Sequence, residues 1–212
     1  MAGGADTRYP DRGLRHAGFL WIRKSLLSLP NRRGAGKRPM ETITTTYLEM
    51  TDAAQLRAKT CGDPRFRILE ATVKQWRFNR FLYEFIGEAW EWRAKLSWRD
   101  EQWRLYVEDA GLRTFVAYYD GALAGYFELS ARDRDIEIAY FGLAPHFIGR
   151  GLGGPLLTRA LEEAWALKPK RVWVHTCTLD HDAALANYRA RGMVVYKTVT
   201  SQPNKPSACE NE

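Results

Sequence analysis

A cluster of four glycines lies between a run of strand-forming residues and an amphipathic segment. The glycines are Gly149, Gly151, Gly153 and Gly154. From residue 152 to residue 165, apolar residues recur at helical spacing, which predicts a helix that begins within the cluster. The first backbone N–H groups of a helix have no partner inside it, and the helix dipole is positive there. A glycine-rich turn at this place therefore predicts a binding site for a phosphate group.

Three kinds of phosphate-binding loop compete for this segment. A P-loop requires Gly-Lys-Ser/Thr, and no lysine stands here, which excludes it. The dinucleotide fingerprint G-x-G-x-x-G is matched by Gly149, Gly151 and Gly154, but it requires an acidic residue about 20 positions later. The next predicted strand, Val172–His175, continues into Thr-Cys-Thr-Leu instead. A nicotinamide dinucleotide is therefore the less favoured ligand.

The third interpretation is a resemblance to a known family. Pro145 and the glycines that follow it resemble the coenzyme A pyrophosphate loop of the GNAT superfamily of N-acetyltransferases, whose pattern is Arg/Gln-x-x-Gly-x-Gly/Ala after a proline. The family glycines fall on Gly151 and Gly153, whereas the leading Arg/Gln falls on Ile148, which is a departure. The resemblance implies cofactor contacts, mostly through backbone amides, at Gly149, Arg150, Gly151, Leu152, Gly153 and Gly154.

A second block supports the same family. Residues 179–193 resemble its Asn-x-x-Ala-x-x-Leu-Tyr-x-x-x-Gly-Phe block, and together the two blocks extend the resemblance over roughly residues 114–197. Three positions match the block: Ala184, Tyr188 and Gly192. Three positions differ, with His for Asn, Asn for Leu and Met for Phe: His181, Asn187 and Met193.

The resemblance implies transfer of an acetyl group from acetyl-CoA to a primary amine by direct attack. It places the backbone contacts to the pantetheine and the thioester carbonyl at Phe141, Gly142 and Leu143, and further cofactor contacts at His181 and Asn187. A plain surface histidine and a helix side chain facing solvent are the alternatives at these last two positions. A longer acyl group, or a coenzyme A-binding sensor module without catalysis, are the alternative functions.

Glu137 and Tyr188 are the candidate catalytic residues. Strand alternation places Glu137 on the same face as Phe141, where a carboxylate is costly unless it is partnered or useful. In some family members a glutamate at this place acts as the base, and the alternative is a salt bridge with Arg132 or Arg134. Tyr188 is the candidate acid for the thiolate, because a phenol with an ordinary pKa of about 10 stays protonated at neutral pH. Its alternative role is core packing.

Aromatic residues are dense between residues 76 and 103. In the family, the corresponding helix–loop–helix forms one wall of the acceptor site, so we expect Tyr83, Glu84, Trp90 and Trp92 to shape the amine pocket. The alternative is that these aromatic rings pack in the core. The acceptor stays open between a small polyamine or aminoglycoside, an amino acid, a peptide N-terminus and a lysine.

The order of elements indicates a mixed α+β fold with a central, mostly antiparallel sheet flanked by helices, and the resemblance implies that this sheet is splayed. Strands are predicted over residues 42–50, 66–70, 114–119, 123–129, 136–143 and 172–175, with one more at the end. Helices are predicted over residues 73–88 and 98–109, after Leu152, and after Asp180 as the N-cap residue.

The net positive charge of the chain comes from its first 39 residues. Residues 1–39 carry nine of the 32 Lys and Arg residues and two of the 25 Asp and Glu residues, so the remainder is neutral. We therefore expect no nucleic-acid partner. Residues 1–39 are predicted to be a basic, disordered extension, residues 40–200 the acyl-CoA N-acyltransferase domain, and residues 201–212 a flexible tail.

The remaining composition predicts a cytoplasmic protein without metal. No apolar run approaches the ~18 residues of a membrane span, so no membrane contact is expected. Cys61, Cys177 and Cys209 show no paired spacing, and the four histidines complete no zinc pattern, which suits a reducing compartment. The resemblance also allows a homodimer.

Overall fold

The computed structural model describes residues 42–90 and 92–201, which contain seven strands and four α-helices. The strands are β1 (Ile43–Met50), β2 (Phe66–Glu70), β3 (Leu112–Tyr119), β4 (Ala122–Arg132), β5 (Asp135–Leu143), β6 (Arg171–Cys177) and β7 (Val194–Ser201). The helices are α1 (Trp76–Gly87), α2 (Asp100–Glu108), α3 (Gly153–Ala166) and α4 (Ala183–Ala190). Each predicted strand and helix is confirmed, with boundaries that differ by a few residues.

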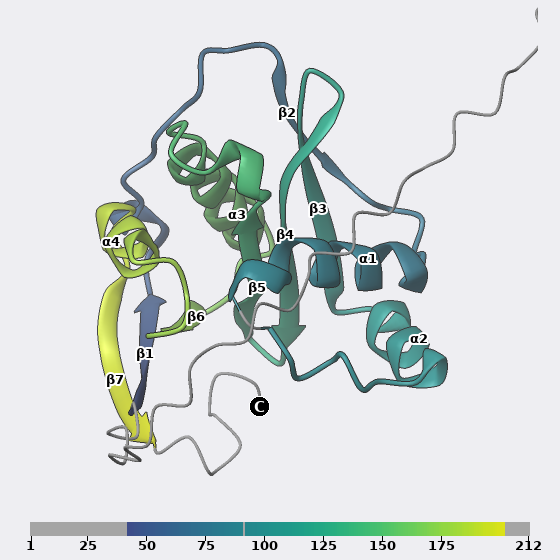
Figure 1. The fold of residues 1–212 in the computed structure, drawn as a ribbon. Coiled ribbons are helices and arrows are strands. Elements are labelled where there is room, and N and C mark those ends of the chain that lie inside the picture. Colours follow the sequence, from purple (N-terminus) through teal and green to yellow (C-terminus); the bar gives the residue numbers. More distant parts are fainter. Residues whose placement is uncertain (1–41, 91, 202–212) are drawn as a thin grey trace, which may run out of the picture. The chain divides into compact units, whose positions relative to one another are not determined.

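The strands form one sheet in the order β2-β3-β4-β5-β6-β1-β7 (Figure 1). Neighbouring strands are antiparallel except β5 and β6, which run parallel. Helix α1 packs against β4 and β5, and α3 packs against β4, β5 and β6. The predicted mixed α+β fold, with a mostly antiparallel sheet flanked by helices, is confirmed.

Helix α3 forms because its apolar residues recur every three or four positions and so lie on one side of the helix. These residues are completely buried in the core, and they are Leu156, Leu157, Ala160, Leu161 and Ala164. Their packing fixes α3 on the sheet and therefore fixes the place of the glycine turn from which the helix starts.

The sheet opens between the neighbouring strands β5 and β6. The parallel pairing of β5 with β6 covers only three residue pairs, the last of which joins Glu137 to Trp173. Beyond this pair the two strands continue for several residues without pairing to each other. The backbone groups of β5 on that side are therefore not used by a strand partner, and the predicted splay of the sheet is confirmed.

A bulge in β5 decides which of its side chains share a face. The register between β4 and β5 shifts between Ile138 and Tyr140, which leaves Ala139 without a cross-strand partner. An extra residue of this kind reverses the alternation of side chains beyond it. Glu137 therefore shares a face with Tyr140, and the prediction that it shares a face with Phe141 is wrong.

A carboxylate is buried beneath α1, where the sequence analysis predicted none. Glu128 of β4 is 2% exposed, and its two oxygens accept hydrogen bonds from Asn79 Nδ2 at 2.8 Å and from the Tyr106 hydroxyl at 2.5 Å. Burial raises the pKa of this carboxyl, and the two hydrogen bonds and the nearby Lys95 oppose that rise. The same reasoning that singled out Glu137 applies to Glu128, which also stands in an apolar strand.

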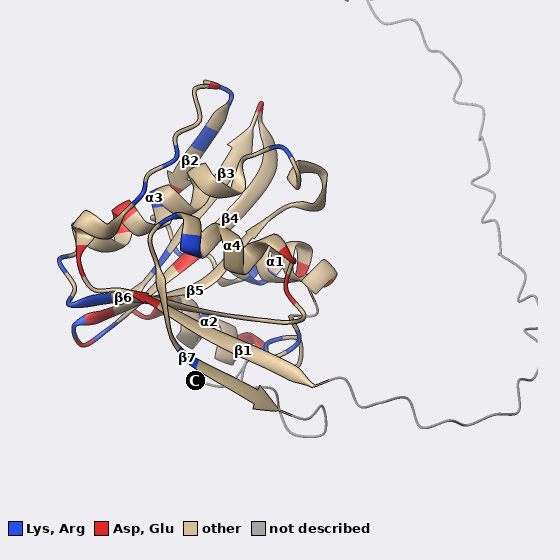
Figure 2. Cartoon of the chain, turned by 90° about the vertical axis from the view of Figure 1, so that its left-hand side faces the viewer, with Lys and Arg blue, Asp and Glu red and all other residues tan. Residues whose placement is uncertain are grey.

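Two of the predicted segments lie wholly or mostly outside the described residues. This holds for the basic extension 1–39 and for the tail from residue 202 on, while Ser201 is the last residue of β7. Among the described residues, no helix is long and apolar enough to cross a membrane. On the side of the molecule drawn in Figure 2, basic and acidic residues are scattered over the ribbon.

We expect the substitution Asn79→Ala to lower the free energy of unfolding by about 1.5–3 kcal/mol, because a buried carboxylate loses a hydrogen-bond donor. The hydrogen bond favours the charged form of Glu128, so the loss shrinks as the pH falls through the folded-state pKa of Glu128. Urea unfolding at several pH values measures both effects. The control is Arg77→Ala at an exposed position of α1, and equal losses in the two variants would contradict the expectation.

Candidate functional site

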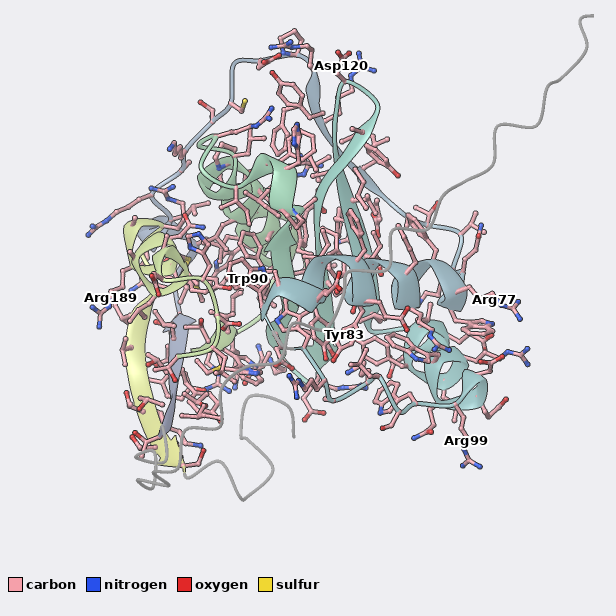
Figure 3. All side chains as sticks on the ribbon, in the orientation of Figure 1. Arg77, Tyr83, Trp90, Arg99, Asp120 and Arg189 are labelled. Atoms are coloured by element: carbon pink, nitrogen blue, oxygen red, sulfur yellow. The ribbon has the colours of Figure 1, made fainter. Side chains whose placement is uncertain are left out.

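A cavity of about 570 Å³ opens where β5 and β6 separate. It runs from the glycine turn before α3, along β5 and the start of α4, to the end of α1. Figure 3 shows Tyr83 and Trp90 near the middle of the molecule, whereas Arg77 and Arg189 point outwards. Most of the predicted site residues line this cavity: Tyr83, Trp90, Trp92, Phe141, Gly142, Leu143, Gly149, Gly151, Gly153, Gly154, His181, Asn187 and Tyr188.

Besides Glu137, which is described below, three predicted site residues lie away from the cavity wall. Glu84 accepts a hydrogen bond from Arg80 Nε at 2.7 Å and lines a separate groove along α1. Arg150 places a guanidinium nitrogen 2.8 Å from His146 Nε2. Leu152 is 5% exposed and belongs to the apolar core. The structure therefore does not bring these side chains together with the others.

The glycine turn presents backbone to one end of the cavity. Gly149 and Gly151 have φ of 78° and 77°, a left-handed conformation that glycine adopts without strain. Helix α3 starts directly afterwards, and no side chain caps its N-terminal N–H groups. These donors and the helix dipole make this end suited to a phosphate group, as the sequence predicted. Ile148, at the position of the departure from the family pattern, also lines the cavity.

Two cations that the sequence analysis missed stand beside this turn. Lys59, from the connection between β1 and β2, lines the cavity. A Cβ added to Gly154 would lie 2.7 Å from Lys59 Cδ and 2.5 Å from a guanidinium nitrogen of Arg191. Both side chains therefore lie against the first turn of α3. No pattern in the sequence connects Lys59 with a turn about 90 positions later.

Tyr188 lies on the α3 side of the sheet. It is 5% exposed, lines the cavity, and its ring centroid is 5.9 Å from that of Phe141. Burial raises the pKa of its phenol far above the usual value, and the charge of Asp180 adds to the rise. The hydroxyl therefore stays protonated at any physiological pH and can act only as a proton donor there.

Glu137 and His175 lie on the opposite face of the sheet. Glu137 does not line the cavity, but His175 of β6 does. A carboxylate oxygen of Glu137 is 3.5 Å from His175 Nδ1. The ion pair with Arg132 or Arg134, which the sequence left open, is not the contact that forms: Arg132 pairs with Asp109 instead. The structure thus joins the predicted base to a histidine that reaches the cavity.

Aromatic rings form the wall of the cavity nearest α1. The ring centroids of Tyr83, Trp92 and Tyr140 lie 5.0–5.7 Å from one another. Trp90 makes an edge contact with His181 at 5.1 Å. Tyr140 was not among the predicted residues, because only the bulge turns its side chain towards α1.

The start of α4 differs from the prediction in one detail. The helix begins after Asp182, so the prediction of Asp180 as N-cap is wrong. Asp180 instead accepts hydrogen bonds from the Thr176 hydroxyl at 2.6 Å and the Cys177 backbone N–H at 3.0 Å. Asn187 donates to the Gly153 carbonyl at 3.2 Å, which ties α4 to the first residue of α3.

The described part of the chain contains no candidate metal-binding group of side chains. Among residues 42–90 and 92–201, no group of three or more His, Cys, Asp or Glu side chains could hold a metal ion.

A family model described as the acetyltransferase (GNAT) family matches residues 72–193 of the chain. This range includes the glycine turn, the split strands, the aromatic wall and α4. The sequence has no match among curated proteins. Acyl-CoA is the co-substrate that the matched family uses.

Solved structures share the fold at low sequence identity. A GCN5-related N-acetyltransferase from Kribbella flavida aligns with a TM-score of 0.53 and 16% identity, over 76% of this chain and 59% of its own. A tandem GNAT protein from the clavulanic acid biosynthesis pathway gives 0.52 and 19%, over 80% and 56%. An aminoglycoside acetyltransferase from an uncultured soil metagenomic sample gives 0.51 and 16%, over 61% and 88%. The chain thus spans less than two thirds of the first two proteins.

We expect Lys59→Gln to weaken the binding of acetyl-CoA about tenfold, because one charged contact to the phosphate groups is lost at the glycine turn. Isothermal titration of the full chain with acetyl-CoA measures the dissociation constant. Arg189→Gln is the matched control, since Arg189 is exposed on α4 and points away from the cavity (Figure 3). Equal binding by the Lys59 variant and the wild type would show that Lys59 does not contact the ligand.

Proposed function

Since the chain belongs to the acetyltransferase (GNAT) family, we propose that it transfers an acetyl group from acetyl-CoA to a primary amine by direct attack. The observation that carries the proposal is the single cavity between the split strands. It joins the glycine turn to Tyr188 on one face of the sheet and to His175 on the other. A thioester cofactor and an amine can therefore approach each other through the sheet from its two sides.

The cofactor lies along the α3 and α4 side of the opening in this proposal. Its pyrophosphate binds the backbone N–H groups at the start of α3, and Lys59 and Arg191 supply the side-chain charge that Ile148 cannot. The pantetheine arm follows β5 beyond Glu137, where the backbone has no pairing with β6. Peptide N–H groups in this stretch stabilise the oxyanion that develops on the thioester carbonyl.

The proton transfers follow from the positions of His175 and Tyr188. His175 accepts a proton from the acceptor ammonium, and Glu137 stabilises the resulting imidazolium. The amine nitrogen then attacks the carbonyl carbon, a C–N bond forms, and the C–S bond breaks. Tyr188 donates its proton to the departing thiolate and is reprotonated from solvent, while the attacking nitrogen releases its second proton to solvent. The products are the neutral N-acetylated amine and free coenzyme A, and His175 then releases the proton that it took from the ammonium.

The similarity to solved structures does not identify the amine acceptor. One similar structure is an aminoglycoside acetyltransferase, but at 16% identity the likeness shows the fold alone. The class of amine therefore has to be inferred from the walls of the cavity.

We expect Tyr188→Phe to lower kcat by about 10²–10⁴, the usual range for a general acid, without changing the dissociation constant of acetyl-CoA. Because burial raises the pKa of Tyr188, the wild-type rate is not expected to fall through ionisation of this phenol up to about pH 10. Steady-state rates and a binding titration check these points. Tyr196→Phe, at an exposed position of β7, is the control that keeps full activity.

We expect His175→Gln to lower kcat/KM for the amine by about 10²–10⁴ and Glu137→Gln to lower it less, because Glu137 acts through the imidazole. The double variant is expected to be no slower than His175→Gln alone, since the two residues act as one unit. Initial rates of the wild type, the two single variants and the double variant, measured between pH 6 and 9, check these expectations. A large loss in Glu137→Gln beside a small loss in His175→Gln would make Glu137 itself the base.

The full chain with acetyl-CoA and a panel of amines, assayed for release of free thiol, tests the proposed reaction. Thiol release that requires both an amine and acetyl-CoA, and that Gly151→Glu abolishes, supports it. Binding of acetyl-CoA without turnover of any amine would instead favour a coenzyme A sensor. Faster turnover of a longer acyl-CoA would change the donor, and absence of acetyl-CoA binding by folded protein would reject the proposal.

A further inference from the structure

The cavity offers an acceptor very little negative charge. Among its described lining residues, Asp180 is the only carboxylate, and its hydrogen bonds from Thr176 and Cys177 hold the chain at the end of β6. The described lining also contains three basic side chains, which are Lys59, His175 and His181. An acceptor with several ammonium groups binds tightly only where carboxylates pair with them, and the described lining residues do not provide such a set.

Three further carboxylates, none of them among the described lining residues, have partners elsewhere. Glu128 lies in the core with its oxygens on Asn79 and Tyr106. Glu84 pairs with Arg80 on the outer side of α1. Glu137 stands behind His175 and is therefore placed to balance a single imidazolium. One positive charge at the reacting nitrogen can be accommodated, and these three described carboxylates offer no partner for a second one.

A fixed cation lies behind the aromatic wall. Lys95 Nζ donates to the Tyr140 hydroxyl at 2.9 Å and lies 4.3–4.8 Å from the ring centroids of Trp98, Tyr106 and Tyr140. These rings already stabilise one ammonium group through their electron-rich faces. A second ammonium placed against Tyr140 from the cavity side would therefore compete with Lys95 for the same electron-rich ring.

The same wall is well suited to an apolar group. Tyr83, Trp92 and Tyr140 pack on one another, and Tyr83 also makes an edge contact with Trp103 at 5.6 Å. The Tyr83 hydroxyl accepts a hydrogen bond from the Lys95 backbone at 3.2 Å, so the wall is held in place before an acceptor arrives. A flat ring or a branched hydrocarbon gains the most binding free energy when it packs against such a rigid aromatic surface.

From these observations we infer that the acceptor is a primary amine that carries one aromatic or branched apolar group and no second positive charge. The apolar group packs against Trp92 and Tyr140, and the amino nitrogen points to His175. This inference rests on the proposed acetyltransferase function and narrows it. Polyamines and aminoglycosides, which the sequence left open as acceptors, are poor acceptors by this inference.

Matched amines test the inference on the full chain at saturating acetyl-CoA. Hexylamine and 1,5-diaminopentane have nearly the same length, and the second replaces a terminal methyl group by an ammonium group. 2-Phenylethylamine adds a ring, while spermidine and kanamycin represent the polycations. We expect kcat/KM to be at least about tenfold higher for hexylamine than for 1,5-diaminopentane, and highest for 2-phenylethylamine.

Variants of the wall provide the second measurement. Trp92→Ala is expected to raise the KM for 2-phenylethylamine at least about tenfold while the dissociation constant of acetyl-CoA stays within about twofold. Trp92→Phe keeps a ring and is expected to retain most of the affinity, which separates loss of the wall from loss of folding. Trp76→Ala, outside the cavity lining on α1, is the control and leaves both quantities unchanged.

The outcomes separate this inference from the function on which it rests. Equal or higher kcat/KM for 1,5-diaminopentane, spermidine or kanamycin than for the apolar amines overturns the inference and leaves the acetyltransferase intact. An unchanged KM in Trp92→Ala overturns the assigned packing surface. Binding of acetyl-CoA without acetylation of any amine removes the proposed function and the inference together.

Discussion

The short parallel contact between β5 and β6 is the constraint on which the rest of the structure depends. Pairing over three residues holds the two halves of the sheet together, and its end at Glu137 opens the sheet. Because the opening passes through the sheet, side chains from both faces reach one cavity. Tyr188 comes from the α3 side and His175 from the α1 side. A fully paired sheet would keep these two residues in separate environments.

The bulge at Ala139 adds a second condition. It turns Tyr140 towards α1 and leaves Phe141 facing α3, so the aromatic wall and the contact with Tyr188 are built by consecutive residues of one strand. The buried network of Glu128, Tyr106 and Asn79 lies beneath this wall. It is costly to bury, and its hydrogen bonds fix α1 and α2 relative to the sheet. Stability and the shape of the acceptor wall are therefore linked.

The two ends of the cavity differ in charge for a physical reason. At the glycine turn, Lys59 and Arg191 add to the positive end of the α3 dipole, which suits a ligand with phosphate groups. At the other end, the carboxylate of Glu128 is engaged in the fold and the ammonium group of Lys95 lies against the aromatic cluster. This difference in charge between the two ends is the basis of the proposal that an anionic cofactor and an amine with a single charge react in this cavity.

The sequence by itself determined the features that depend on local pattern. Strand and helix periods placed the elements, the glycines located the turn before α3, and the family resemblance of the second block singled out Tyr188. Tertiary structure alone decided which side chains meet. The bulge cannot be read from β5, because residues 138–143 are apolar or aromatic on both faces and alternation carries no signal there. Lys59, Lys95 and His175 reach the site from distant segments, since the register and packing of the sheet, and not any local spacing, bring them together.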